Sequence, residues 1–187
     1  MTAREALQRL NEGHQRFLSR GPREHPGVRH GARAELHRPM AAVLGCADAR
    51  VAPEILFDQP MGELFVIRNA GHVVRNAELA SLEYASTVLE VPLVVVLGHT
   101  QCAAVNLALE PNPSRLPAHL QLLARSIRLG LGERRMEPEA AVRKHVRATM
   151  EAIRNASEVL GSRIGAGKLT LKGAIYDVSS ASLEWLG

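Results

Sequence analysis

Aromatic residues and long apolar runs are scarce in this sequence, and each scarcity excludes something. Phe, Trp and Tyr together make up 3% of the 187 residues, so a core must be built mainly from Leu, Val, Ile and Ala. The longest uncharged apolar run, 91–98, is far shorter than the roughly 20 residues that a membrane helix needs. We therefore predict that the chain has no membrane partner.

The N-terminal segment lacks the apolar stretch of a signal peptide, because Arg4, Glu5 and Arg9 interrupt it. This predicts a cytoplasmic protein, in which a disulfide between the two cysteines of the chain is not expected. A block of one charge is also missing. The net charge is +4, but basic residues alternate with acidic ones and few aromatic rings are available to stack on bases. We predict a mildly basic, solvated surface and no nucleic-acid partner.

The remaining composition, 46% apolar and 22% charged, is that of an ordinary globular protein, and the length suits one domain. Within 1–187 we expect an N-terminal helical arm at 1–37 and an α/β core at 40–187. The pattern predicts strands at 41–45, 64–68, 94–98, 169–177 and 182–185, and helices at 2–18, 32–37, 53–57, 76–90, 103–109, 116–129 and 138–160.

The order of these elements predicts an α/β fold with a mainly parallel central sheet, of about four parallel strands plus an edge strand, flanked by helices. The N-terminal helix should protrude from this core. The segment after it, 21–31, is rich in Pro and Gly, and a helix on such an arm is suited to embracing a second copy of the chain. We therefore expect a homodimer or a dimer of dimers.

Both cysteines follow buried strands directly. Cys46 comes after the run at 41–45, and His99 and Cys102 come after the run that ends at Gly98. Ligands bind at the carboxyl ends of parallel strands, and thiolate and imidazole are ligands that zinc prefers. The pattern predicts a zinc site of Cys46, His99 and Cys102. Buried structural cysteines and a redox pair are the alternatives, although the sequence has no C-x-x-C.

The motif Cys46-Ala47-Asp48-Ala49-Arg50, followed some fifty residues later by His99-x-x-Cys102, resembles the β-class carbonic anhydrases. The segments 63–71, 81–85 and 173–177 are similar to that family as well. The resemblance implies a zinc enzyme, with one Zn²⁺ per chain, that interconverts carbon dioxide and bicarbonate and works as a dimer or larger assembly. It also implies that Asp48 orients the zinc-activated water while Arg50 holds Asp48 in place.

Asp48 has a second implied role, because in some family members the equivalent aspartate turns onto the zinc as a fourth ligand. Phe65 and Tyr84 match residues that line the family's substrate pocket at the dimer interface, although each would also suit a core. Two pocket positions depart from the family pattern. Ala103 stands where glycine is common, and His37 stands where many relatives have glutamine. A surface histidine and a proton-transfer group are the two interpretations of His37, of which the first is favoured.

Three other functions remain open from the sequence. The same site would suit hydrolysis of carbon disulfide or carbonyl sulfide, whose carbon is an equally exposed electrophile. A non-catalytic, zinc-binding regulatory protein is the second, although the complete set of ligands and the Asp48–Arg50 pair argue against a degenerate site. A nucleic-acid binder with structural zinc would need a fourth ligand, for which His72 is the candidate.

Overall fold

The computed structural model describes residues 1–21, 38–132 and 136–186. The expected helix at 32–37 therefore lies outside the described residues. In chain order the elements are α1 (Ala3–Arg20), β1 (Ala41–Cys46), α2 (Pro53–Leu56), β2 (Leu64–Asn69), η1 (Ala70–His72), α3 (Asn76–Thr87), β3 (Leu93–His99), α4 (Ala103–Leu109), η2 (Pro113–Arg115), α5 (Ala118–Leu131), α6 (Pro138–Ala156), α7 (Glu158–Gly165), β4 (Thr170–Tyr176) and β5 (Leu183–Leu186).

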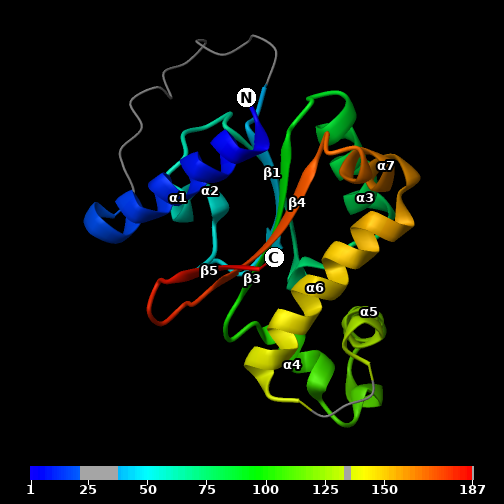
Figure 1. Ribbon diagram of the computed structural model, residues 1–187. Coiled ribbons are helices and arrows are strands. Elements are labelled where there is room, and N and C mark those ends of the chain that lie inside the picture. Colours follow the sequence, from blue (N-terminus) through cyan, green and yellow to red (C-terminus); the bar gives the residue numbers. More distant parts are fainter. Residues whose placement is uncertain (22–37, 133–135, 187) are drawn as a thin grey trace.

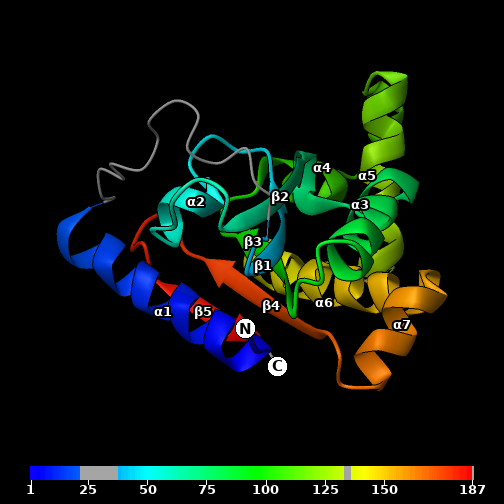
Figure 2. The ribbon, with the colours of Figure 1, turned by 90° about the horizontal axis from the view of Figure 1, so that it is seen from above.

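The five strands form one twisted sheet in the order β2-β1-β3-β4-β5. The first four are parallel, and β5 joins β4 as an antiparallel edge strand, which confirms the predicted sheet. Helices α1 and α2 lie on one face, and the longer layer that contains α3, α6 and α7 lies on the other (Figures 1 and 2). The chain adds β2 on one side of β1, and it adds β3 and β4 on the other side. The order in which strands are added therefore reverses between β1 and β3, although these two strands are parallel.

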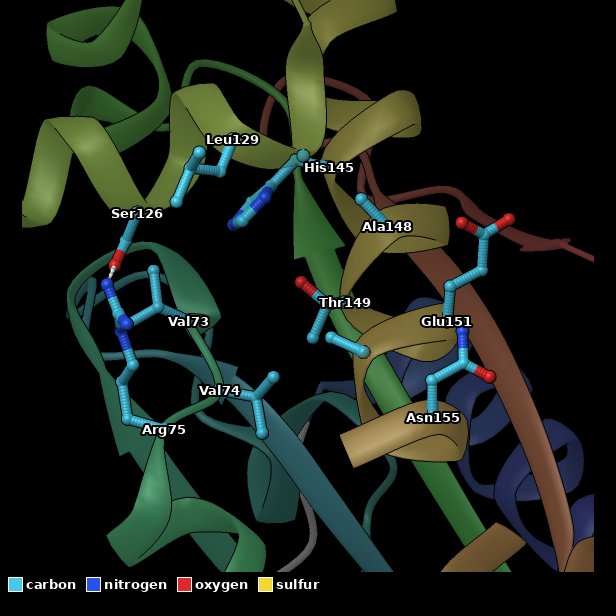
Figure 3. A pocket seen from close by; sticks show the side chains of 12 residues that line it. Val73, Val74, Arg75, Ser126, Leu129, His145, Ala148, Thr149, Glu151 and Asn155 are labelled. Carbon is cyan, nitrogen blue, oxygen red and sulfur yellow. Dashed lines mark hydrogen bonds between the residues drawn. The ribbon is translucent and has the colours of Figure 1, made fainter. Parts of the chain in front are cut away.

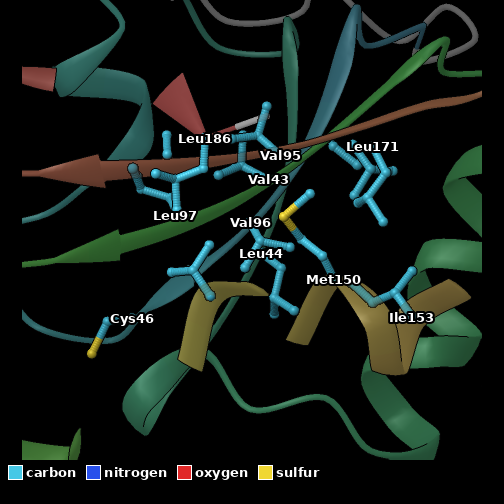
Figure 4. Packing of buried hydrophobic residues seen from close by; sticks show 14 of the residues in the cluster. Val43, Leu44, Cys46, Val95, Val96, Leu97, Met150, Ile153, Leu171 and Leu186 are labelled. Carbon is cyan, nitrogen blue, oxygen red and sulfur yellow. The ribbon is translucent and has the colours of Figure 1, made fainter. Parts of the chain in front are cut away.

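The centre of the sheet is apolar on both faces because helices cover both. All residues of β1 and β3 are buried. Leu44 and Val96 lie on the side of the sheet that faces Met150 and Ile153 of α6, and Val43 and Val95 lie on the opposite side (Figure 4). Gly98 allows the close approach of α6, since a Cβ there would lie 2.5 Å from Val146 Cγ2. The tight packing fixes the end of β3, where His99 follows.

The predicted N-terminal helix is confirmed. Thr2 caps α1 by accepting a hydrogen bond from the backbone of Glu5, and the Glu5 carboxylate accepts one from the backbone of Thr2. The last turn extends beyond the sheet at the left of Figure 1, whereas the inner face, with Leu10 and Gly13, is buried against α2. None of the helices in the described ranges combines the length and the apolar character that crossing a bilayer requires.

The largest departure from the expected elements is at the helix predicted over 138–160, which is two helices. Ser157 adopts an extended conformation between α6 and α7, and its Oγ accepts a hydrogen bond from the backbone of Leu160, so that it caps α7. The Ser157 hydroxyl also donates a hydrogen bond to Glu83 on α3. The apolar period continues across this break, so the pattern alone indicated one helix.

Candidate metal centre

The three predicted ligands converge where β1 and β3 end. Cys46 is the last residue of β1, His99 is the last residue of β3, and Cys102 is the N-cap of α4. Their ligand atoms all lie within 4.8 Å of one another, and all three residues are buried. This is the point where the strand order of the sheet reverses, which is where parallel α/β sheets bind their ligands.

The orientation of the His99 ring is set by its own backbone. Nδ1 lies 2.8 Å from the carbonyl oxygen of Thr100, and because a carbonyl can only accept, Nδ1 carries the hydrogen. Nε2 is then a bare acceptor, and this buried atom has no hydrogen-bond partner. The ring therefore presents a lone pair toward the cysteines, which is the arrangement of a metal-binding histidine.

The two sulfur atoms are 4.0 Å apart, so the cysteines are free thiols. A hydrogen bond from Cys102 lowers the pKa of Cys46 to about 4, with further help from the backbone N–H of Gly71. The same bond, together with burial, raises the pKa of Cys102. Without a metal, the pair therefore shares one proton at neutral pH.

Asp48 and Arg50 lie beside this cluster as a pair. Arg50 donates from Nε to Oδ1 at 2.9 Å and from Nη2 to Oδ2 at 2.7 Å, and its backbone N–H also donates to Oδ1. These bonds hold the pKa of Asp48 well below its usual range. The aspartate is thus a fixed, ionised acceptor two residues from a cysteine ligand candidate.

Sequence reasoning missed two supports of this site. Arg68, at the end of β2, donates to the carbonyl oxygens of Cys46 and Asp48 at 2.9 and 2.6 Å, and so holds the loop between them. Gly71 donates its N–H to Cys46 Sγ at 3.4 Å, and its carbonyl oxygen lies 2.8 Å from His145 Nε2. The only sequence signal for the role of Arg68 is its position as a charged residue at the end of a strand. The sequence gives no signal for the contact between His145 and Gly71, because the two residues are 74 positions apart.

The predicted pocket residues are not all brought together. Phe65 and Tyr84 contact each other with ring centroids 6.2 Å apart, and Tyr84 is 49% exposed. Phe65 pairs with Ala42, four residues before Cys46, which places it about 13 Å along the strand from the cysteines of its own chain. Ala103 is the exposed first residue of α4, next to Cys102. His37 lies outside the described residues.

His72 was the candidate fourth ligand of a structural zinc site. It is fully buried, and its ring lies against that of His145 with centroids 4.6 Å apart, but it does not belong to the group of three ligand atoms. The metal cluster is therefore a three-residue one within the part of the chain that the structure describes. Three protein ligands leave a fourth position open, as in catalytic zinc sites.

The chain is thus an α/β protein with a parallel sheet, in which two cysteines and a buried imidazole at the switch point form a group that could hold a metal ion. Comparisons with known proteins narrow this class. The family model described as carbonic anhydrase matches residues 41–183. The chain belongs to the β-class carbonic anhydrase family.

The similarity extends over nearly the whole chain. The chain is 41% identical to carbonic anhydrase 2 of Mycobacterium tuberculosis over 92% of its own length and 87% of that protein's. It is 38% identical to a carbonic anhydrase of Mycolicibacterium smegmatis, over 96% and 91% of the two chains. Among solved structures, the β-carbonic anhydrase of Coccomyxa in complex with acetazolamide aligns with a TM-score of 0.70 at 28% identity, covering 82% of this chain and 74% of that one.

Proposed function

We propose that this chain catalyses the reversible hydration of carbon dioxide to bicarbonate and a proton, with one zinc ion held by Cys46, His99 and Cys102. The observation that carries the proposal is the buried, unpartnered Nε2 of His99, on a ring that has a nitrogen within 4.8 Å of both sulfur atoms. A buried nitrogen without a partner is costly unless something binds it. A metal ion is the natural partner for a lone pair that faces two thiols.

The donor set fits zinc. Two sulfurs that each lie about 2.3 Å from a tetrahedral zinc are about 3.8 Å apart, close to the 4.0 Å between Cys46 Sγ and Cys102 Sγ. Mixed thiolate and imidazole ligands also favour zinc over the harder Mg²⁺ and Ca²⁺. When bound, the zinc supplies a Lewis acid that activates water at neutral pH.

Asp48 and Arg50 orient the reactants around that site. Asp48 accepts a hydrogen bond from the attacking water, which turns a lone pair of the water toward the electrophilic carbon of carbon dioxide. Arg50 keeps the carboxylate in this position, since it engages both carboxylate oxygens. While those bonds persist, Asp48 is kept from turning onto the metal, which supports the open arrangement as the resting state.

A second copy of the chain completes the substrate pocket. Phe65 and Tyr84 are too far along β2 and α3 to line the crevice of their own subunit, and their partly exposed rings are suited to the crevice of another. In this arrangement two apolar rings exclude bulk water and admit a small apolar gas. Ala103 would contribute a methyl group beside the same site, since it follows Cys102 directly.

The decisive experiment is stopped-flow carbon dioxide hydration, with zinc measured on the same sample. We expect about one zinc per chain and hydration that scales with zinc content. Cys102→Ala should lose both stoichiometric zinc and activity. A fully zinc-loaded chain that does not hydrate carbon dioxide would overturn the function, and a Cys102→Ala variant that keeps its zinc would overturn the ligand set.

A further inference from the structure

A pocket of about 450 Å³ lies between α5, α6 and the segment that follows β2. Arg75 and Ser126, joined by a hydrogen bond, form one rim, and Glu151 and Asn155 lie at the opposite side (Figure 3). Neither the predicted zinc ligands nor the Asp48–Arg50 pair lines this pocket. Its volume falls within the range of about 300–1,000 Å³ that is typical of sites for small molecules.

A buried histidine forms the inner end of the pocket. His145 extends from α6 into the space between Leu129 and Val73 (Figure 3), and the residue is 4% exposed. Its Nδ1 has no hydrogen-bond partner. On the facing helix, Gly130 has no side chain to cover this nitrogen, since a Cβ there would lie 4.0 Å away.

The hydrogen bond on the other side of the ring fixes what Nδ1 offers. Nε2 lies 2.8 Å from the carbonyl oxygen of Gly71, which can only accept, so Nε2 carries the hydrogen. Burial lowers the pKa of His145, which keeps the ring neutral at physiological pH. A neutral ring with its hydrogen on Nε2 has a bare lone pair on Nδ1. A ligand that complements the inner end of the pocket therefore carries a hydrogen-bond donor.

The walls set the rest of the ligand's chemistry. Val73, Val74, Leu129 and Ala152 supply the apolar part of the pocket's lining. We propose that this pocket is a second ligand site, distinct from the metal centre, for a small neutral molecule with an apolar body and a hydroxyl group that donates to His145 Nδ1. An anion is disfavoured because the lone pair on Nδ1 would repel it. An ammonium group is disfavoured because it would be buried at the inner end without a charged partner.

The site is connected to the metal centre through one residue. Gly71 accepts the hydrogen bond from His145 through its carbonyl oxygen and donates its N–H to Cys46 Sγ. Gly71 has φ +71°, and a Cβ would lie 3.0 Å from both Ala104 and Ile127, so it has little room to move independently. An occupant that shifts the His145 ring therefore shifts the hydrogen bond to a cysteine ligand candidate.

The test uses zinc-loaded protein and benzyl alcohol, which has one hydroxyl donor on an apolar ring. Nitrogen NMR of the imidazoles should show a saturable shift of the His145 Nδ1 signal, which is assigned by its loss in His145→Asn. Toluene, which lacks the donor, and benzoate, which is an anion, should bind at least about tenfold more weakly. Equal affinity for the three compounds would overturn the proposed ligand class.

A pair of matched variants locates the binding. Ala152→Leu fills the pocket from its half-buried wall and should abolish the shift, whereas Ala140→Leu, on the exposed side of the same helix, should leave it unchanged. The zinc content of both variants is measured to confirm that the metal centre is intact. A His145 shift that survives in Ala152→Leu, or no saturable shift in the wild type, would show that the pocket is not a ligand site.

Discussion

At the scale of single residues, the hydrogen bonds around Asp48 decide what this carboxylate can do. Arg50 occupies one lone pair on each oxygen and adds its backbone N–H, so the carboxylate plane is fixed. Each oxygen retains further capacity to accept a bond from water. In the proposed mechanism the pair therefore acts as one unit: Asp48 would orient the water, and Arg50 would contribute to that step only through Asp48.

Because the two residues act together, their substitutions should not add. We expect Asp48→Ala to lower the kcat/KM of hydration by about a hundred-fold or more while it keeps its zinc, and Arg50→Ala to have a similar effect. The double variant should be little worse than either single one. The measurement is stopped-flow hydration at matched zinc content.

Arg143→Ala is the matched control. Arg143 on α6 forms an exposed ion pair with Glu184 on β5, and neither residue belongs to the metal centre. This variant should leave hydration unchanged. Near-normal activity of Asp48→Ala would contradict the proposed role of the carboxylate.

The cysteine pair predicts how metal affinity depends on pH. The pKa of Cys46 is about 4 and that of Cys102 is raised, so at pH 7 the metal-free pair holds the Cys102 proton. Both sulfurs must be thiolates in the zinc complex, so binding should release about one proton from the pair. As pH falls, protons compete with zinc, and its Kd should rise about tenfold per pH unit.

Proton release is measured with an indicator dye in weak buffer, and the Kd by competition with a chelator over the range of about pH 6 to 8. A Kd that does not change with pH would mean that the metal-free pair carries no proton, contrary to the hydrogen bond between the two sulfurs.

The ligand candidates could be predicted from the sequence because each lies at, or within three residues of, the end of a recognisable buried strand. Their convergence needs only the rule that parallel strands end at the same edge of a sheet. His72 and His145 could not be placed in this way. Their rings meet because α6 packs over the end of β3, and this contact depends on the tertiary packing of segments that are far apart in the sequence. The pocket that contains His145 therefore could not be predicted from the sequence.

At the scale of secondary structure, the central strands were the easiest elements to predict, because a strand that is buried on both faces is apolar throughout. Helix α1 shows the limit of such patterns. Its apolar stripe predicted a helix with one buried face, but not which surface covers it. In the structure α1 approaches α2 so closely that the backbone of Phe57 lies directly over Gly13.

This close approach makes Gly13 a position where no side chain fits. A Cβ at Gly13 would lie 1.7 Å from the carbonyl oxygen of Phe57 and 2.7 Å from Gln59 Nε2, so α1 would have to move away. We expect Gly13→Ala to cost about 1–3 kcal/mol of stability, and thermal unfolding followed by circular dichroism measures it.

Gly165→Ala is the matched control, since Gly165 ends α7 and a Cβ added there would have nothing within 4 Å. Alanine has the higher helix propensity, so this variant should be neutral or slightly more stable. Equal stability of the two variants would mean that α1 does not pack against Phe57 as the structure describes.

At the scale of the whole molecule, the position of Phe65 and Tyr84 argues for a second subunit. The metal crevice lies at the carboxyl ends of β1 and β3, whereas these two rings lie near the beginning of β2 and on α3. One turn after Tyr84, Val88, the C-cap of the same helix, is 59% exposed. Two apolar side chains in this arrangement form a surface that a second copy of the chain would cover.

We therefore expect the protein to be a dimer at micromolar concentration, and expect Val88→Lys to weaken it by about tenfold or more in Kd, because a charge would be buried in the interface. Val159→Lys is the matched control, since Val159 on α7 is also exposed, at 43%, but lies on another helix. Sedimentation equilibrium measures the assembly.

If Phe65 and Tyr84 complete the partner's crevice, monomeric Val88→Lys should keep its zinc but lose hydration, and activity should return as the protein concentration is raised. A wild-type chain that is a folded, active monomer would contradict both the interface and the shared pocket.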